Sequence, residues 1–164
     1  MSLKSKLAGG VRRVLPSGVV SKVETSYRKA RVKALSARYG YPARNLKIIA
    51  VTGTNGKTTT ANYLNEILKA AGYKTAMFTT ALIEVAGEAR LNDLNMTVAS
   101  TDQMQRFFRD AKNATVDFVV LEVTSHSLTQ HKLDGVPIEA AIMTNLTQDH
   151  LDYHEAMEAY GLAK

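Results

Sequence analysis

The stretch VTGTNGKTTT, residues 51–60, has the residue types of a phosphate-binding loop but not the usual spacing. The strict pattern is a glycine, four further residues and then Gly-Lys-Ser/Thr. Here Val51 occupies the first glycine position, and the glycine comes two residues later, at Gly53. The stretch is therefore either a distinct form of nucleotide loop or a Gly-Asn turn that simply begins a helix.

The residues of this loop suit the binding of a triphosphate and of Mg²⁺. Gly53 and Gly56 allow the backbone to turn tightly and to approach a phosphate without a Cβ in the way. Successive backbone N–H groups of the loop can form an anion-binding nest, and the positive end of the following helix adds to it. Lys57 would reach the β- and γ-phosphates, and the hydroxyl of Thr58 would bind Mg²⁺.

A second candidate is Glu122, which interrupts the apolar stretch DFVVLEV at residues 117–123. A buried carboxylate without a partner is costly, so Glu122 should face a metal ion or a basic group. The alternative is that this glutamate lies on a solvent-facing edge of a sheet.

A third cluster lies in residues 144–154, TNLTQDHLDYH. Its histidines and aspartates suit divalent cations. The alternative is an ordinary helix start that Asp149 or Asp152 caps. His154 fits that alternative best, whereas His150 lies nearer the end of the preceding strand.

Alternating strands and helices must position these three clusters. Strands are predicted at residues 47–52, 74–80, 117–123 and 138–144, helices at 57–71, 101–113 and 153–163, and a hairpin at 82–91 around Ala86-Gly87. This order predicts an α/β fold with a mostly parallel sheet and helices on both faces. Ligands of such sheets bind beyond the carboxyl ends of the strands, where all three clusters lie.

Composition narrows the class of protein. The chain has 164 residues, of which 45% are hydrophobic and 22% are charged, as in soluble globular domains. No apolar run reaches the roughly 18 residues that a membrane span needs, and the N-terminus does not have the pattern of a signal peptide. Because the chain has no cysteine, disulfides and thiol catalysis are excluded. We expect a cytoplasmic protein.

The positive charge is concentrated in a basic N-terminal arm. Residues 1–47 contain twelve Lys and Arg but a single acid, Glu24. A helix is predicted over residues 20–38, with Val23 and Tyr27 in its apolar stripe. This helix would either pack its stripe on the domain or lie on an anionic membrane surface. Because no aromatic stacking pattern accompanies the charge, we expect no nucleic-acid partner.

Together the motifs resemble the Mur ligase family, in particular the central ATPase domain of its UDP-N-acetylmuramoyl-tripeptide synthetase branch. Residues 53–59, GTNGKTT, match the family's loop, so the short glycine spacing is that family's own form. Residues 122–126, EVTSH, are similar to its E-V-S-S-H motif, and residues 144–154 match its third motif. The resemblance implies a P-loop NTPase-like domain.

The resemblance implies an ATP-dependent ligase that adds an amino acid to a UDP-MurNAc-peptide-type precursor. ATP would phosphorylate the acceptor carboxylate to an acyl phosphate, from which the incoming amine displaces phosphate. The implied cofactors are ATP and Mg²⁺. The implied partners are a nucleotide-linked peptidoglycan precursor and an amino acid.

The same resemblance assigns roles to individual residues. The catalytic residues would be Lys57, His150 and Lys164, the last as a lysine that CO₂ carbamylates. The ATP-binding residues would be Gly53, Thr54, Asn55, Gly56, Lys57, Thr58 and Thr59. The ligands of Mg²⁺ would be Thr58, Glu122 and His150. The precursor would contact Thr97, Thr124, Gln130 and Lys132, of which the last replaces a family arginine.

We expect two parts, a basic and partly helical arm at residues 1–44 and a central ATP-binding domain at residues 45–164. The family's N-terminal uridine-binding and C-terminal domains have no counterpart in these residues, so we expect a part of a ligase that is inactive alone. Two alternatives stay open. One is a folylpolyglutamate-synthetase-like ligase, and the other is a non-catalytic nucleotide-binding module that docks a partner through the arm.

Overall fold

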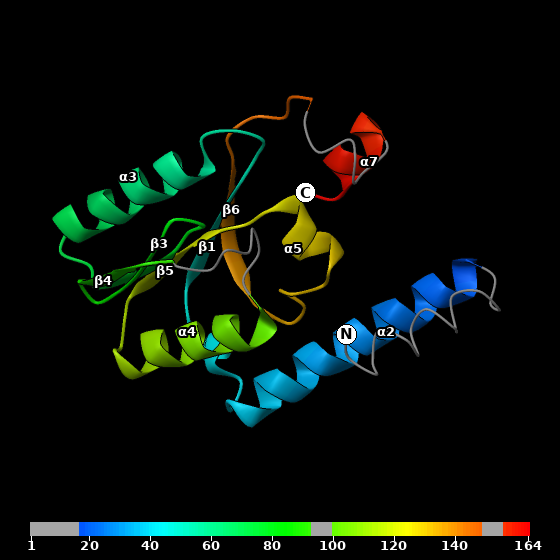
Figure 1. Cartoon of the computed structure of the whole chain (residues 1–164). Coiled ribbons are helices and arrows are strands. Elements are labelled where there is room, and N and C mark those ends of the chain that lie inside the picture. The colour runs from blue at the N-terminus through cyan, green and yellow to red at the C-terminus, as the bar shows by residue number, and fades with distance from the viewer. Residues whose placement is uncertain (1–16, 93–99, 149–155) are drawn as a thin grey trace.

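A six-stranded sheet organises the computed structural model, which describes residues 17–92, 100–148 and 156–164 (Figure 1). The strand order is β4-β3-β2-β5-β1-β6. The parallel strands are β1 (Ile48–Thr52), β2 (Thr75–Phe78), β5 (Phe118–Glu122) and β6 (Ile138–Met143). The antiparallel hairpin of β3 (Leu82–Val85) and β4 (Glu88–Leu91) extends the sheet beyond β2. The predicted mostly parallel sheet is confirmed.

Helices cover both faces of this sheet, as predicted (Figure 1). One face packs against α3 (Lys57–Ala70), and the other packs against α4 (Thr101–Asn113) and the 3₁₀ turn η1 (Pro42–Asn45). Short helices α5 (Ser125–Thr129) and α7 (Met157–Leu162) follow β5 and β6. Within β5, Val119 and Leu121 enter the core under α4, whereas Val120 enters the core under α3. This alternation explains why the strand has no polar face until Glu122.

Most element boundaries agree with the sequence pattern. The hairpin turns at Ala86-Gly87, whose positive φ angles of 53° and 91° suit a two-residue turn. The strand predicted at residues 74–80 ends earlier, at Phe78, because Thr79 turns the chain. Its hydroxyl accepts a hydrogen bond from the backbone N–H of Leu82 at 2.8 Å. Part of the helix predicted at 153–163 lies outside the described residues, and α7 occupies the rest.

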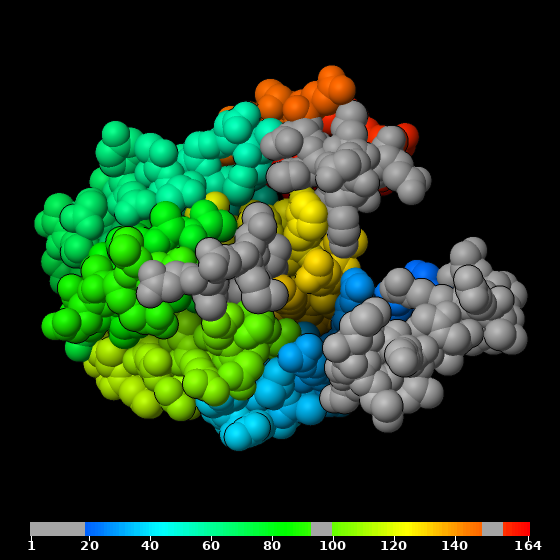
Figure 2. All heavy atoms as spheres, in the orientation of Figure 1, coloured from blue at the N-terminus to red at the C-terminus, as the bar shows by residue number. Residues whose placement is uncertain are grey.

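The basic arm contains the predicted helix, α2 (Ser17–Arg38), but the alternative in which its Val23 and Tyr27 stripe packs on the domain is wrong. Val23 and Tyr27 are 60% and 66% exposed, whereas Val32 is only 2% exposed. Contacts with α4 follow directly after the C-terminal end of α2. The hydroxyl of Tyr39 donates to Asp102 of α4 at 3.0 Å, and the following turn η1 packs on α4. The C-terminal half of α2 therefore lies beside α4 (Figure 2).

None of the helices in the described parts of the chain is long and apolar enough to cross a bilayer.

Replacing Val32 should loosen α2 from the rest of the molecule. Val32→Ala removes two buried methyl groups, and we expect it to cost about 1 to 2 kcal/mol. Hydrogen exchange of the α2 amides measures this cost, with α3 as the internal reference. Val23→Ala is the matched control on the exposed side of the same helix. Equal acceleration of exchange in both variants would show that Val32 does not anchor α2.

Candidate functional site

The loop at residues 53–56 joins β1 to α3 and needs glycine for a steric reason. Gly53 has a φ of 138°, and a Cβ built on it would lie 1.9 Å from Thr144 Oγ1. That Cβ would also lie 3.1 Å from the backbone nitrogen and oxygen of Asn145. The chain after β6 therefore passes directly against the loop, and only glycine fits at this point.

The segment after β6 also fixes the first half of the loop by hydrogen bonds. The backbone N–H of Thr54 donates to Asn145 O at 3.0 Å, and that of Asn55 donates to Asn145 Oδ1 at 3.0 Å. Thr144 Oγ1 donates to Asn55 O at 2.7 Å. Two of the loop amides that the sequence suggested for phosphate binding thus already have protein acceptors.

The amides at the start of α3 remain as the anion-binding end of the loop. Gly56 is the N-cap of α3, with a φ of 80°. Because glycine has no side chain, the N-cap residue does not occupy the first amides of the helix with a capping hydrogen bond. The first backbone N–H groups of a helix have no acceptor inside the helix, and they carry its positive dipole end. The amides of residues 56–59 therefore form the positive end of the site.

The side chain of Thr54 joins the loop to the segment after β6 and to α7. Its hydroxyl accepts from the backbone N–H of Thr147 at 3.0 Å and lies 3.1 Å from the hydroxyl of Tyr160 in α7. Both Thr54 and Tyr160 are buried. Sequence reasoning gave no role to Tyr160, Asn145 or Thr147. Asn145 and Thr147 lie in the third motif, and this was the signal that could have identified them.

Two lysine ammonium groups converge on the loop. Lys57 Nζ donates to the carbonyl oxygens of Gly53 at 3.1 Å and Thr54 at 2.6 Å. Lys164 Nζ also donates to the Gly53 carbonyl, and it lies 4.6 Å from the centre of the Tyr160 ring. The structure thus brings together two of the three residues that the sequence suggested as catalytic.

Glu122 is buried beside the start of α3. Glu122 is 8% exposed, and its strand β5 lies between β2 and β1 inside the sheet. The alternative that Glu122 lies on a solvent-facing edge of the sheet is therefore excluded. Glu122 Oε2 accepts from Thr58 Oγ1 at 2.9 Å and from the backbone N–H of Thr80 at 3.0 Å. Among the described residues, no basic side chain forms an ion pair with Glu122. A hydroxyl and a carboxylate with this spacing provide the oxygen ligands that Mg²⁺ prefers.

The remaining predicted residues lie in different places. His150 and Thr97 lie outside the described residues, as do Asp149, Asp152 and His154. Within the described ranges, no group of three or more His, Asp or Glu side chains could hold a metal ion, so the metal prediction depends on Thr58 and Glu122 there. Thr59 is exposed on the first turn of α3.

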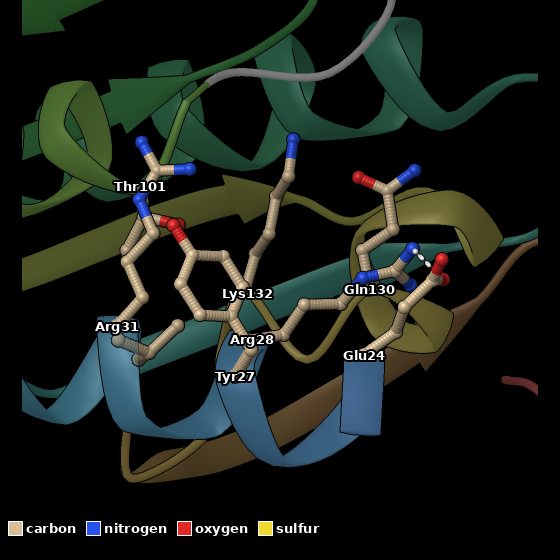
Figure 3. A pocket seen from close by; sticks show the side chains of 8 residues that line it. Glu24, Tyr27, Arg28, Arg31, Thr101, Gln130 and Lys132 are labelled. Carbon is tan, nitrogen blue, oxygen red and sulfur yellow. Dashed lines mark hydrogen bonds and ion pairs between the residues drawn. The ribbon is translucent and has the colours of Figure 1, made fainter. Parts of the chain in front are cut away.

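The predicted precursor-binding residues are divided between two roles. Thr124 caps α5, since its hydroxyl accepts from the backbone N–H of Ser127 at 3.2 Å. Gln130 and Lys132 instead line a cavity together with Arg28 and Arg31 of α2 (Figure 3). Burial lowers the pKa of Lys132, and the positive charges of Arg31 and Arg28 lower it further. The sequence gave no signal that α2 would contribute to this cavity.

Comparison with known proteins decides the family. The family model described as the Mur ligase middle domain matches residues 51–164. The chain belongs to the Mur ligase family. It is similar to the UDP-N-acetylmuramoyl-L-alanyl-D-glutamate–2,6-diaminopimelate ligase of Prochlorococcus marinus, with 45% identity over 126 residues. That match covers 77% of this chain and 24% of the relative, so the chain spans about a quarter of the relative's length.

Solved structures of Mur ligase relatives share the fold. A 2,6-diaminopimelate ligase of the same name matches with a TM-score of 0.63 and 37% identity, covering 72% of this chain and 23% of that one. The FolC protein of E. coli, solved in complex with DHPP and ADP, matches with a TM-score of 0.60 and 27% identity. That match covers 80% of this chain and 37% of FolC. Each match covers most of this chain but less than half of the solved chain.

Proposed function

We propose that this chain is the ATP-binding part of a ligase that joins an amino acid to the carboxylate of a UDP-MurNAc-peptide. The observation that carries the proposal is the juxtaposition at the carboxyl ends of β1 and β5. Lys57 lies across the loop there, and Thr58 lies 2.9 Å from the buried carboxylate of Glu122. Phosphoryl transfer needs this combination of a fixed cation and oxygen ligands for a metal ion.

The residues of the loop and of the adjoining strand end fit a nucleoside triphosphate and Mg²⁺. The amides of residues 56–59 and the Lys57 ammonium provide positive charge for phosphate oxygens. Thr58 and Glu122 would hold the metal ion, which neutralises charge on the β- and γ-phosphates. The solved FolC relative was crystallised with ADP, which supports the assignment of the loop to a nucleotide.

The chain's own residues contribute mainly positioning and charge. In the structure Lys57 donates to two loop carbonyls, which hold its ammonium group against the loop. Phosphate oxygens would replace those neutral acceptors, so that the lysine moves little on binding. Asn145 and Thr144 brace the loop from the side and keep its shape before the nucleotide arrives.

The acceptor and the amine follow from the relatives' names. We propose UDP-N-acetylmuramoyl-L-alanyl-D-glutamate as the acceptor and 2,6-diaminopimelate as the amine. The γ-phosphoryl group passes to the acceptor carboxylate, ADP leaves, and the amine then displaces phosphate to form the amide. His150 is proposed as a second metal ligand. Lys164 is proposed as the carbamylated lysine, a change that would reverse the charge it presents to the loop.

Product analysis with the protein as the cell makes it tests this function. With ATP, Mg²⁺ and the two proposed substrates, we expect ADP and a new amide in equal amounts. An amide formed only from a folate and glutamate would move the assignment to the folate branch. Nucleotide binding without any amide product, over a panel of amino acids, would indicate a non-catalytic module and overturn the ligase proposal.

The Thr58–Glu122 pair should make ATP binding dependent on Mg²⁺. We expect Glu122→Gln to reduce the ratio of ATP affinities with and without Mg²⁺ by about tenfold, because the variant lacks the charge that faces the ion. Calorimetric titration in Mg²⁺ and in a chelator gives this ratio. Thr80→Val is the matched control, since it removes only a hydroxyl that donates to Glu122 Oε2 at 3.3 Å and leaves the carboxylate in place. An unchanged ratio in Glu122→Gln would remove Glu122 from the metal site.

A further inference from the structure

The apolar stripe of α2 faces solvent. Val19, Val23 and Tyr27 are 44%, 60% and 66% exposed. The stripe continues at helical steps of three and four residues through Ala30 and Ala34, which are also exposed. An amphipathic helix of a globular domain normally turns such a face to the core, so this face of α2 has the composition of a surface that a partner covers.

Two rows of cations flank the stripe. At about 100° of rotation per residue, Lys22, Lys29 and Lys33 lie about 80 to 120° to one side of it. Arg31 and Arg38 lie about 60 to 80° to the other side. All five residues are exposed, and none of them forms an ion pair with an acid in the described part of the chain. Long cationic side chains beside an apolar stripe are typical of helices that lie in the interface of a membrane.

The opposite side of α2 is held by the domain. Val32 lies about 180° around the helix from the stripe and is 2% exposed. Beyond the helix, the hydroxyl of Tyr39 donates to Asp102 of α4 at 3.0 Å, and η1 leads from α2 to the amino end of β1. The loop at residues 53–56 follows the carboxyl end of that strand (Figure 1). The stripe therefore faces away from the domain, and α2 and the loop lie at opposite ends of β1.

We propose that α2 docks on the anionic surface of a lipid bilayer. The stripe would lie at the level of the headgroups, with the two rows of cations against lipid phosphates and carboxylates. Because α2 contains six basic residues and the single acid Glu24, two copies packed through this face would bring like charges together, which disfavours a second copy of the chain as the partner. A nucleic acid would use the cations but not the apolar stripe. The proposal is independent of the ligase function, since no residue of the loop takes part in it.

Co-sedimentation with vesicles tests this docking. We expect the chain to bind vesicles of equal parts phosphatidylcholine and phosphatidylserine, and not vesicles of phosphatidylcholine alone. Each cation near an anionic surface strengthens binding by about fivefold, so the double variant Lys29→Ala/Lys33→Ala should bind about 25-fold more weakly. The matched control is Lys74→Ala/Lys112→Ala, which removes the same charge from exposed positions outside α2. Equal weakening in the two double variants, or no binding by wild type, would overturn the proposal.

A fluorescent reporter distinguishes insertion of the stripe from attraction by charge alone. The chain contains no tryptophan, so Tyr27→Trp provides a single reporter within the stripe. Its emission should shift to shorter wavelength with phosphatidylserine vesicles, because the ring leaves water for the membrane interface. Tyr63→Trp is the matched control, since Tyr63 of α3 has a similar exposure of 69%. Binding of Tyr27→Trp to vesicles without a shift, or an equal shift in both variants, would contradict the docking of α2.

Further measurements separate other partners from a lipid surface. We expect sedimentation velocity to show a monomer without vesicles, and a dimer that Val23→Asp dissociates would make the stripe a contact between two copies and overturn the proposal. Double-stranded DNA should not shift the emission of Tyr27→Trp, and tighter binding to DNA than to vesicles would also overturn it. Lys57→Ala should leave vesicle binding unchanged and weaken only the binding of Mg·ATP, so failure of this proposal is distinguishable from failure of the proposed function.

Discussion

Lys57→Ala is expected to weaken Mg·ATP binding by about 10- to 100-fold. A charge-assisted hydrogen bond is worth roughly 1.5 to 3 kcal/mol, and the variant loses such bonds to the phosphates. The folded chain should be little affected, because among the described residues Lys57 donates only to the loop carbonyls of Gly53 and Thr54. Activity of the complete ligase should fall further, since the lysine's charge matters most when γ-phosphate transfer is under way.

Calorimetric titration of Mg·ATP into wild type and variant measures this loss. Lys74→Ala is the control, since it removes an exposed lysine from the opposite, amino end of the parallel strands. Thermal unfolding of each variant checks that the fold is retained. Equal affinity in wild type and Lys57→Ala would remove the phosphate-loop assignment.

Gly53→Ala is the second large effect, and it should damage both stability and binding. The new Cβ would overlap Thr144 Oγ1 and would require a φ of 138° from a residue with a side chain. We expect a loss of about 2 to 5 kcal/mol in the free energy of unfolding. Because Thr144 must move, its hydrogen bond to Asn55 breaks, and Mg·ATP binding should fall with it.

Gly56→Ala is the matched control for this variant. Gly56 also has a positive φ, but a Cβ there meets nothing within 4 Å. The control should therefore lose only about 1 to 2 kcal/mol through backbone strain. Urea unfolding of both variants gives the two values. Equal losses in the free energy of unfolding would mean that the contact with Thr144 is not the reason why position 53 requires glycine.

The fold was largely predictable because each element carries its own local signal. Apolar runs with a polar residue only at the end, as in β5 with Glu122, indicate strands buried on both faces. The Asn-Gly turn at residues 55–56 indicated the start of the helix that follows the loop, α3. These signals depend on neighbours in sequence, so they survive without knowledge of the tertiary structure.

The features that the sequence did not predict depend on contacts between distant segments. The burial of Val32 and the contact between Tyr39 and Asp102 join α2 and α4 across the chain, and helical periodicity alone does not reveal either. The backbone amides of Thr54 and Asn55 donate to Asn145 and are not available to a phosphate, because β6 lies next to β1 and brings Asn145 to the loop. The division at residue 44 and the roles of all the predicted site residues remain predictions.

The most direct test of the central claim is a crystal structure of the chain with Mn²⁺ and a non-hydrolysable ATP analogue. The account predicts anomalous signal from the metal between Thr58 and Glu122, and a γ-phosphate within hydrogen-bonding distance of Lys57. Nucleotide bound elsewhere, with the Thr58–Glu122 hydrogen bond intact and no metal beside it, would contradict the account.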